Sequence, residues 1–561
     1  MQGKIIPFDK NVNRYRRKAD GYADKGNFMR ALAFLNSAKS MDCNLDVLVD
    51  LADAYADMGL LELSNKYWFK FMDKAPKDKI STAYEELAIN YFYLDNYWAS
   101  SYYFHQKLSV DGHIAKEGLS QEIIDFFSGE EQRRLAYRVV YPYHLADFSL
   151  EIKKAKHAMI LGAFEEGQKF LSAIPKECRT EENSGDLAVC YFMCEDFENA
   201  IKECKFSLEK HGETVTAYCN LSTVYDMKED FDKSEFYYRK ALSCAKGEKT
   251  ETYKLATCAI EREDHQTAAD CLKAILEDRP YENAMRFFYG LSLANLGKYE
   301  YALNELKKAY AINDEDVVVK YYHDYVQDLL EQKGDYQNLT PFKYVKELPE
   351  KIAKDWEAWI VALSVKPEKV DSVLKRAQGR RKIVWGLRYG KSEIMRNCVY
   401  ILSLAKCAYA KQLMLDLLLD PECGEELKRV LIYVLIMQGV KSKTGIVAGN
   451  YYMKLKPGKL ACEKDARGAL YTSAYALCIS RILFYEVKDV DKIAKTCDKV
   501  YKKFRSVLTE AEVTNEELAS LILSESKLER FSEEREVLRL FSVEANKLRT
   551  LKKLYKGEKN D

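Results

Sequence analysis

Small and aromatic residues recur every 34 positions between residues 188 and 309, within segments whose other residues follow a charged, helical pattern. Four sets share one register: Ala188, Ser222, Ala256 and Gly290; Phe197, Phe231, His265 and Tyr299; Ala200, Ser234, Ala268 and Ala302; and Ser207, Ala241, Ile275 and Ala309. The pattern predicts four helical hairpins, in which two helices approach closely at the small positions and the aromatic side chain lies at the turn.

This spacing resembles the tetratricopeptide repeat, which has small residues at its eighth, twentieth and twenty-seventh positions and often a proline at its thirty-second, here Pro280. The unit at 249–282 departs most from that pattern, because Ile275 stands where alanine is usual and His265 replaces the aromatic residue. The resemblance implies an all-α fold, namely a right-handed α-solenoid of helical hairpins whose first helices line a concave surface.

Further units fit the same template with small changes in spacing, at 12–43, 45–77, 81–110 and 148–175. An apolar interruption separates the third of these from the fourth, and Ile123, Ile124, Phe126 and Phe127 predict a helix within it. We therefore expect an N-terminal block at 12–110, a helical interruption at 111–147, and a second block at 148–333 that ends in a closing helix at 316–330.

The repeat register ends near residue 341, after a stretch rich in helix breakers, "EQKGDYQNLTPFKYVKELPE". We expect residues 341–561 to form a C-terminal helical domain with a basic face. Two helix pairs within it resemble HEAT repeats, since Arg396 and Arg429 occupy corresponding positions in the two pairs, although the same apolar runs suit any helical bundle. At 444–457, "TGIVAGNYYMKLKP" instead predicts a β-hairpin that turns at Gly449 and Asn450.

Composition favours long helices in a cytoplasmic protein. The 561 residues include only 10 prolines and 25 glycines, and the longest strongly apolar run, at 430–437, is too short to cross a bilayer. The 15 cysteines form no CxxC pair, and every histidine lies at or before His323. We therefore expect core thiols rather than disulfides, and no zinc site in the last part of the chain.

Catalytic motifs are absent from the sequence. The chain has no GxxxxGK(S/T) phosphate loop, no GxSxG elbow and no HExxH pair. Carboxylates are plentiful, but their helical spacing is typical of solvated outer faces. We expect no enzyme activity, no cofactor and no metal site.

The tetratricopeptide resemblance places particular positions of each first helix on the concave surface. In the first three units these positions are mostly acidic: Asp20, Asp24, Asp46, Asp50, Asp53, Asp57, Glu85 and Glu86, with Arg16 and Arg17 near the entrance. An acidic surface predicts a basic peptide or a lysine-rich protein face as the partner, because opposite potentials steer encounter and select partners. The alternative is that these acids only solvate an exposed helix face.

In the second block the same positions are mostly apolar. They include Phe192, Tyr253, Phe287, Phe288 and Leu291. Such a lining suits an amphipathic helix or an extended apolar peptide. The alternative is that the chain itself fills the surface with its interruption or its C-terminal part.

The stretch 374–391 contains seven Lys and Arg and no acid. Its candidate residues for an anionic partner are Arg376, Arg380, Arg381, Lys382, Trp385 and Arg388. We expect the cations to hold phosphates and exposed aromatic side chains, Trp385 and Tyr389, to stack on bases. The alternatives are a solvated helix face or a contact with the acidic array. The second alternative is suggested by charge, since residues 1–333 carry 44 Lys and Arg against 56 Asp and Glu, and residues 334–561 carry 43 against 31.

These observations favour a non-catalytic scaffold or adaptor whose concave surfaces bind protein or peptide segments, with no membrane association. A peptide-responsive sensor that changes the exposure of the C-terminal half is one alternative. A nucleic-acid-associated protein that uses the basic stretch is another, with less support because overall charge is zero.

Overall fold

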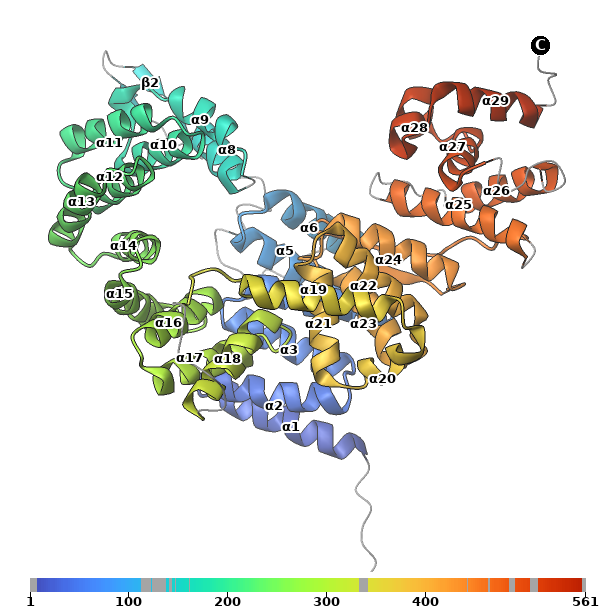
Figure 1. Ribbon diagram of the computed structural model, residues 1–561, viewed down its shortest axis with the longest axis horizontal. Coiled ribbons are helices and arrows are strands. Elements are labelled where there is room, and N and C mark those ends of the chain that lie inside the picture. The colour runs from blue at the N-terminus through green and yellow to red at the C-terminus, as the bar shows by residue number, and fades with distance from the viewer. Residues whose placement is uncertain are drawn as a thin grey trace, which may run out of the picture. The chain divides into compact units, whose positions relative to one another are not determined.

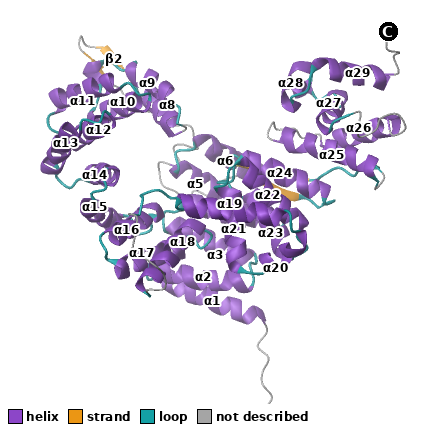
Figure 2. Cartoon of the chain, viewed as in Figure 1, coloured by secondary structure: helices purple, strands orange, loops and turns teal. Residues whose placement is uncertain are grey.

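The computed structural model consists almost wholly of helices, with two short strand pairs among the residues it describes (Figure 1, Figure 2). The structure describes residues 8–111, 123, 138–140, 144–146, 148–160, 162–331, 342–440, 442–462, 465–483, 490–504 and 513–556. The chain divides into two compact units, one of residues 1–114 with 347–561 and one of residues 115–346. The predicted all-α solenoid of tetratricopeptide-type hairpins is confirmed.

The first unit begins with three helical hairpins, one for each repeat expected at 12–110. Their helices are α1 (Phe8–Ala23), α2 (Phe28–Met41), α3 (Leu45–Asp57), α4 (Leu61–Lys74), α5 (Ile80–Tyr93) and α6 (Tyr97–Asp111), with a 3-10 turn at Lys77–Lys79 before α5. Each first helix packs along the second helix of its own hairpin and each second helix along the next first helix. We call these six helices the N-terminal array.

The second unit contains five hairpins and a closing helix, which we call the second array (Figure 1). Its helices are α8 (Ser149–Ile160), α9 (Phe164–Ser172), α10 (Glu181–Met193), α11 (Phe197–His211), α12 (Val215–Met227), α13 (Phe231–Cys244), α14 (Lys249–Glu261), α15 (His265–Asp278), α16 (Asn283–Asn295), α17 (Tyr299–Ile312) and α18 (Val317–Leu330). A 3-10 turn at Lys176–Cys178 precedes α10. The closing helix expected at 316–330 is therefore present as α18.

The small residues of the repeat register lie where paired helices touch. Ala200, Ala268 and Ala302 are fully buried. Ser222 and Ser234 each donate a hydrogen bond to the other's carbonyl oxygen at 3.0 Å, across α12 and α13. A Cβ on Gly290 would lie 2.9 Å from Leu306 Cγ, so a larger residue there would separate α16 from α17. Close contact at these positions is the reason for the repeat.

The turns inside the hairpins recur with the same period as the small residues. Glu195, Glu229 and Glu263 adopt the left-handed backbone conformation, with φ of 62°, 59° and 57°, and Gly297 does so with φ of 72°. Only glycine adopts this conformation without steric cost, so Gly297 is the residue that this turn favours. Aspartates follow the three glutamates and cap the next helix by accepting a hydrogen bond from a backbone N–H.

Most of the interruption expected at 111–147 lies outside the described residues, including Ile124, Phe126 and Phe127 of the predicted helix. Ile123 is helical and buried. The described part also contains an antiparallel pair that the sequence analysis missed, β1 (Arg138–Val140) with β2 (His144–Ala146).

The C-terminal part of the first unit is helical apart from one β-hairpin. Its helices are α19 (Glu350–Ser364), α20 (Val370–Leu374), α21 (Ala377–Arg388), α22 (Ser392–Leu404), α23 (Ala408–Leu419), α24 (Glu425–Met437), α25 (Ala466–Ile482), α26 (Val490–Phe504), α27 (Asn515–Glu525), α28 (Glu534–Phe541) and α29 (Ala545–Lys556), with 3-10 turns at Pro367–Lys369 and Glu529–Phe531. The resemblance of this part to HEAT repeats stays a prediction.

The β-hairpin predicted at 444–457 is confirmed. Strand β3 (Thr444–Ala448) pairs antiparallel with β4 (Tyr451–Leu455), and Ala448 faces Tyr451 across a two-residue turn. Gly449, the first turn residue, has a positive φ of 57°, as a tight hairpin turn requires. Ile446 and Val447 are fully buried, so this hairpin is part of the core rather than a surface loop.

The hairpin packs on the second helices of the N-terminal array. The Tyr103 hydroxyl of α6 donates to the Asn450 carbonyl oxygen at 2.6 Å and accepts the Tyr452 N–H at 3.0 Å. Asp73, near the end of α4, accepts the Gly445 N–H at 2.8 Å. Phe69 stacks on the Tyr452 ring, with the two rings within 8° of parallel. The N-terminal array and the β-hairpin of the C-terminal part therefore share one core.

Gly445 is the position at which this contact leaves least room. A Cβ there would lie 2.4 Å from Asp73 Oδ1 and 2.9 Å from Leu419 Cδ2. We predict that Gly445→Ala lowers the free energy of unfolding of the full chain by roughly 1–3 kcal/mol in urea denaturation, because β3 must move away from α4. The matched control is Gly21→Ala in α1, where a Cβ would meet nothing within 4 Å. Equal stability of the two variants would contradict the tight packing of β3.

Candidate functional site

The acidic face of the N-terminal array consists of the six predicted residues Asp46, Asp50, Asp53, Asp57, Glu85 and Glu86, which lie on α3 and α5. Part of this charge is neutralised within the array. Arg16 of α1 pairs with Asp50 at 2.5 Å and with Asp46 at 3.0 Å. Lys107 of α6 pairs with Glu85 at 2.7 Å.

The remaining three acids of this face crowd one another. Burial, with repulsion from Asp50 and Asp57, raises the pKa of Asp53 to about 6. Burial, with repulsion from Asp53 and Glu85, raises the pKa of Glu86 to about 7, and burial also raises the pKa of Asp57. No hydrogen bond or ion pair joins these three carboxylates to a cation among the described residues. Ionisation of these three acids is therefore unfavourable, because no cation in the described part of the chain pairs with them.

The apolar lining predicted for the second array is only partly present. Phe192, Tyr253 and Phe288 are partly buried and pack at the edge of the core. Phe287 and Leu291 are fully buried, so the prediction that they face a partner is wrong. Phe287 packs edge-to-face on Tyr322 of α18, with ring centroids 5.5 Å apart, because this side of α16 meets the closing helix.

The basic stretch is a packed helix rather than an open cationic face. Trp385 has only 4% of its surface exposed and packs edge-to-face on Trp356 of α19, so the prediction that it stacks on a base is wrong. Lys382 lies over Trp359, and burial lowers the pKa of its ammonium group. Arg380 donates to the Leu374 carbonyl oxygen at 2.5 Å and lies over the Tyr409 ring. Arg376 is exposed and Arg381 half-buried.

Arg388, the last cation of that helix, belongs to a buried charge cluster. Its guanidinium pairs with Asp420 at 2.5 Å, and Asp420 also pairs with Lys66 of α4 at 3.0 Å. Asp420 has 1% of its surface exposed and the Lys66 side chain 6%. One carboxylate thus joins α21 to the N-terminal array. Sequence analysis missed this contact, because no pattern in either segment signals a partner so distant in the chain.

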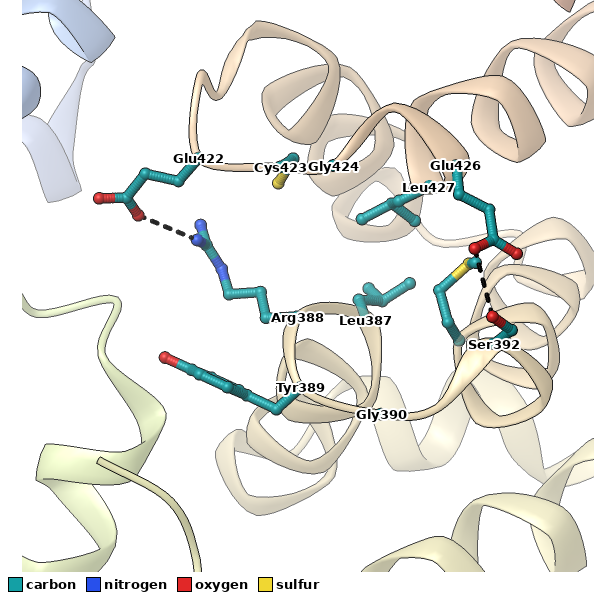
Figure 3. Close-up of a pocket in the computed structure, with 11 residues that line it drawn as sticks. Leu387, Arg388, Tyr389, Gly390, Ser392, Glu422, Cys423, Gly424, Glu426 and Leu427 are labelled. Carbon is teal, nitrogen blue, oxygen red and sulfur yellow. Dashed lines mark hydrogen bonds and ion pairs between the residues drawn. The ribbon is translucent and has the colours of Figure 1, made fainter. Parts of the chain in front are cut away.

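A cavity of about 370 Å³ adjoins Arg388 (Figure 3). It is lined by Leu387, Arg388, Tyr389, Gly390, Ser392, Met395, Glu422, Cys423, Gly424, Glu426 and Leu427. Its two acids already accept hydrogen bonds, Glu422 from Arg388 at 3.4 Å and Glu426 from Ser392 at 3.2 Å. Burial raises the pKa of the Cys423 thiol to about 11, which keeps it protonated and a weak nucleophile at neutral pH. The lining therefore offers a polar recess without an activated nucleophile.

Neither a metal site nor a membrane span is found in the described ranges. No group of three or more His, Cys, Asp or Glu there is arranged to hold a metal ion. No helix there combines the length and the apolar character that crossing a membrane requires. All 15 cysteines are free thiols.

No family model matches the chain. Similar solved structures include YrrB, a TPR protein with an unusual peptide-binding site, at 21% identity over 28% of this chain and 79% of that one, with a TM-score of 0.24. The TPR2AB domain of yeast Sti1 in a pHSP90 complex is 15% identical over 54% of this chain and 98% of its own, with a TM-score of 0.19. MamA protein is 16% identical over 30% and 92%, with a TM-score of 0.23. The array of tetratricopeptide-type hairpins in this chain is recognised from its own register and helix pairing.

We predict that Asp420→Asn lowers the free energy of unfolding by about 3–5 kcal/mol, because Lys66 and Arg388 would lose their shared buried counter-charge. Urea denaturation of the full chain measures the change. The control is Glu425→Gln, which removes an exposed pair with Arg429 at 3.0 Å and should cost about 1 kcal/mol or less. A loss for Asp420→Asn no greater than that of the control would contradict the role of this cluster.

The crowded acids predict a stability that rises on mild acidification. The folded pKa values of Asp53 and Glu86 lie above their ordinary values, so the stabilisation from their protonated forms is lost as pH rises through about 6 and 7. Thermal unfolding of wild type should therefore show a higher midpoint at pH 5.5 than at pH 8, relative to the double variant Asp53→Asn with Glu86→Gln. Parallel pH profiles for the two proteins would contradict the raised pKa values.

Proposed function

We propose that this chain is a non-catalytic scaffold or adaptor that binds segments of other proteins, and that the acidic face of its N-terminal array takes a basic segment. The observation that carries the proposal is the group of Asp53, Asp57 and Glu86, whose pKa values are raised by burial, with mutual repulsion adding to the shift at Asp53 and Glu86. A lysine or arginine from a partner would supply the missing counter-charge and return these pKa values towards the ordinary range. Each charge-assisted hydrogen bond so formed would add roughly 1.5–3 kcal/mol.

The position of the β3–β4 hairpin is consistent with the acidic face as the binding surface. Most of its polar contacts are made with α4 and α6, through Asp73 and Tyr103, and one is made with Tyr91 of α5. The acids lie elsewhere on the array, on α3 and on the earlier part of α5. The second helices thus make most of the intramolecular contact, while Asp53, Asp57 and Glu86 on the first helices have no ion-pair partner among the described residues. We further propose a cytoplasmic location, in keeping with 15 free thiols in one chain.

Among the alternatives, the sensor is favoured by one observation: residues 342–346 of the chain lie against the second array, immediately before the C-terminal part. Nucleic-acid association has lost one of its two expected stacking residues, since Trp385 is buried, although Tyr389 is exposed. We therefore retain the sensor as the second candidate.

The test is binding of fluorescein-labelled decalysine to the full chain at low ionic strength. The triple variant Asp53→Asn, Asp57→Asn and Glu86→Gln should weaken binding by about tenfold or more, because it removes the acids that lack a counter-charge. The matched control removes three exposed acids from second helices of the other array, with Asp232→Asn, Glu277→Gln and Glu300→Gln.

Binding that both triple variants weaken equally would show a non-specific effect of net charge and would overturn the proposed surface. Labelled decaglutamate should not bind any of the three proteins. A capture experiment on cell lysate, compared between wild type and the two triple variants, then identifies the natural partner.

A further inference from the structure

Residues Phe342–Lys346 follow the second array as a segment that is neither helix nor strand, that bends from Tyr344 onward and whose burial alternates. Phe342 is buried and Tyr344 and Lys346 are half-buried, whereas Lys343 and Val345 between them are exposed. Every second side chain of the segment, Phe342, Tyr344 and Lys346, therefore contacts the array. The segment and the array belong to the same compact unit.

The backbone of this segment is held by one side-chain amide. Asn295, the last residue of α16, accepts the Phe342 N–H on Oδ1 at 2.7 Å and donates from Nδ2 to the Phe342 carbonyl oxygen at 2.8 Å. Both hydrogen bonds are made to the backbone of Phe342, so they do not depend on the side chain at that position. These hydrogen bonds would form equally with a partner segment whose backbone follows the same path.

Phe342 and Tyr344, whose side chains point to the array, each make specific contacts with it. Phe342 packs on Tyr322 and Tyr325 of α18, with ring centroids 6.0 Å and 5.6 Å away. Tyr344 lies against Phe288 of α16, and its hydroxyl lies 2.9 Å from His265 Nδ1. We call this set of residues on α15, α16 and α18 the α16–α18 face.

The third inward position carries a charge requirement. Asp316, which caps α18 through the N–H groups of Val318 and Val319, also pairs with Lys346 at 2.7 Å. The Asp316 side chain has 2% of its surface exposed, so its carboxylate would be costly to leave without a cation. The face therefore selects aromatic, aromatic and basic side chains at every second position.

We propose that Phe342–Lys346 is an internal ligand of the α16–α18 face, and that the face binds a partner segment with two aromatic residues and a lysine or arginine at alternate positions, in competition with it. The occupant of the resting protein is the chain's own segment. The inference deepens the proposed scaffold function by naming a second site, its ligand chemistry and its regulation. Displacement would free residues 342–346, which immediately precede the C-terminal part in the sequence, as the sensor alternative requires.

The test uses the full chain and a fluorescein-labelled peptide with the sequence of residues 340–348, TPFKYVKEL. The double variant Phe342→Ala with Tyr344→Ala opens the face in cis and should bind the peptide about tenfold or more tightly than wild type, because wild type must first expel its own segment. Adding Asn295→Ala to the opened variant should weaken binding by roughly tenfold through loss of the two backbone hydrogen bonds.

Three controls accompany this measurement. A peptide with alanine at both aromatic positions, and one with glutamate in place of the lysine that corresponds to Lys346, should not bind the opened variant. The double variant Phe236→Ala with Tyr301→Ala removes two exposed aromatic residues from the same array and should bind as wild type does. Equal affinity for wild type and the opened variant, or no binding to either, would overturn the proposal.

A second measurement needs no opened variant. Hydrogen–deuterium exchange of wild type should become faster at residues 342–346 when the peptide is added in excess, because the added peptide displaces them. Peptide binding without faster exchange would show that the internal segment is not displaced and would overturn the competition. Failure of the decalysine experiment, by contrast, concerns residues of the N-terminal array and would leave this result standing.

Discussion

Close approach of two helices at small residues is the contact on which this structure depends. At Ser222 and Ser234 the two side chains hydrogen-bond across α12 and α13, and at Gly290 no Cβ could be accommodated without moving Leu306. The same contact recurs in successive hairpins of the second array and holds the two helices of a hairpin together, so that the hairpins can stack as repeated units. The acidic face of the N-terminal array is formed by residues of the first helices α3 and α5.

The two arrays differ in which of their helices are covered by other segments of the chain. The N-terminal array buries parts of its second helices under β3 and β4, through Tyr103 and Asp73, and keeps acids on its first helices. In the second array, the chain's own residues 342–346 lie against α15, α16 and α18, held by Asn295 and Asp316. An acidic surface stays soluble when empty, whereas an aromatic one is protected from non-specific association by an internal occupant.

Sequence analysis predicted the hairpin repeats, the closing helix and the β-hairpin, because each of these depends on contacts between residues close in the chain. It was wrong about Trp385, Phe287 and Leu291, all of which are buried. Helical periodicity predicts that an apolar residue is covered, but it does not show whether a neighbouring helix or a partner protein covers it. The alternation in Phe342–Lys346 was a signal that could have been read, since aromatic, aromatic and basic residues occupy every second position.

The sequence alone therefore determined the hairpins, their register and the sign of the charge on their first helices, since these follow from spacing within a single repeat. Only the tertiary structure decided which charges are compensated and which apolar faces are covered. Asp73 meets Gly445 across 372 positions of the chain, and Asp420 joins Lys66 to Arg388. Pairing and burial depend on distance in space. Local sequence patterns do not predict that distance for residues so far apart in the chain.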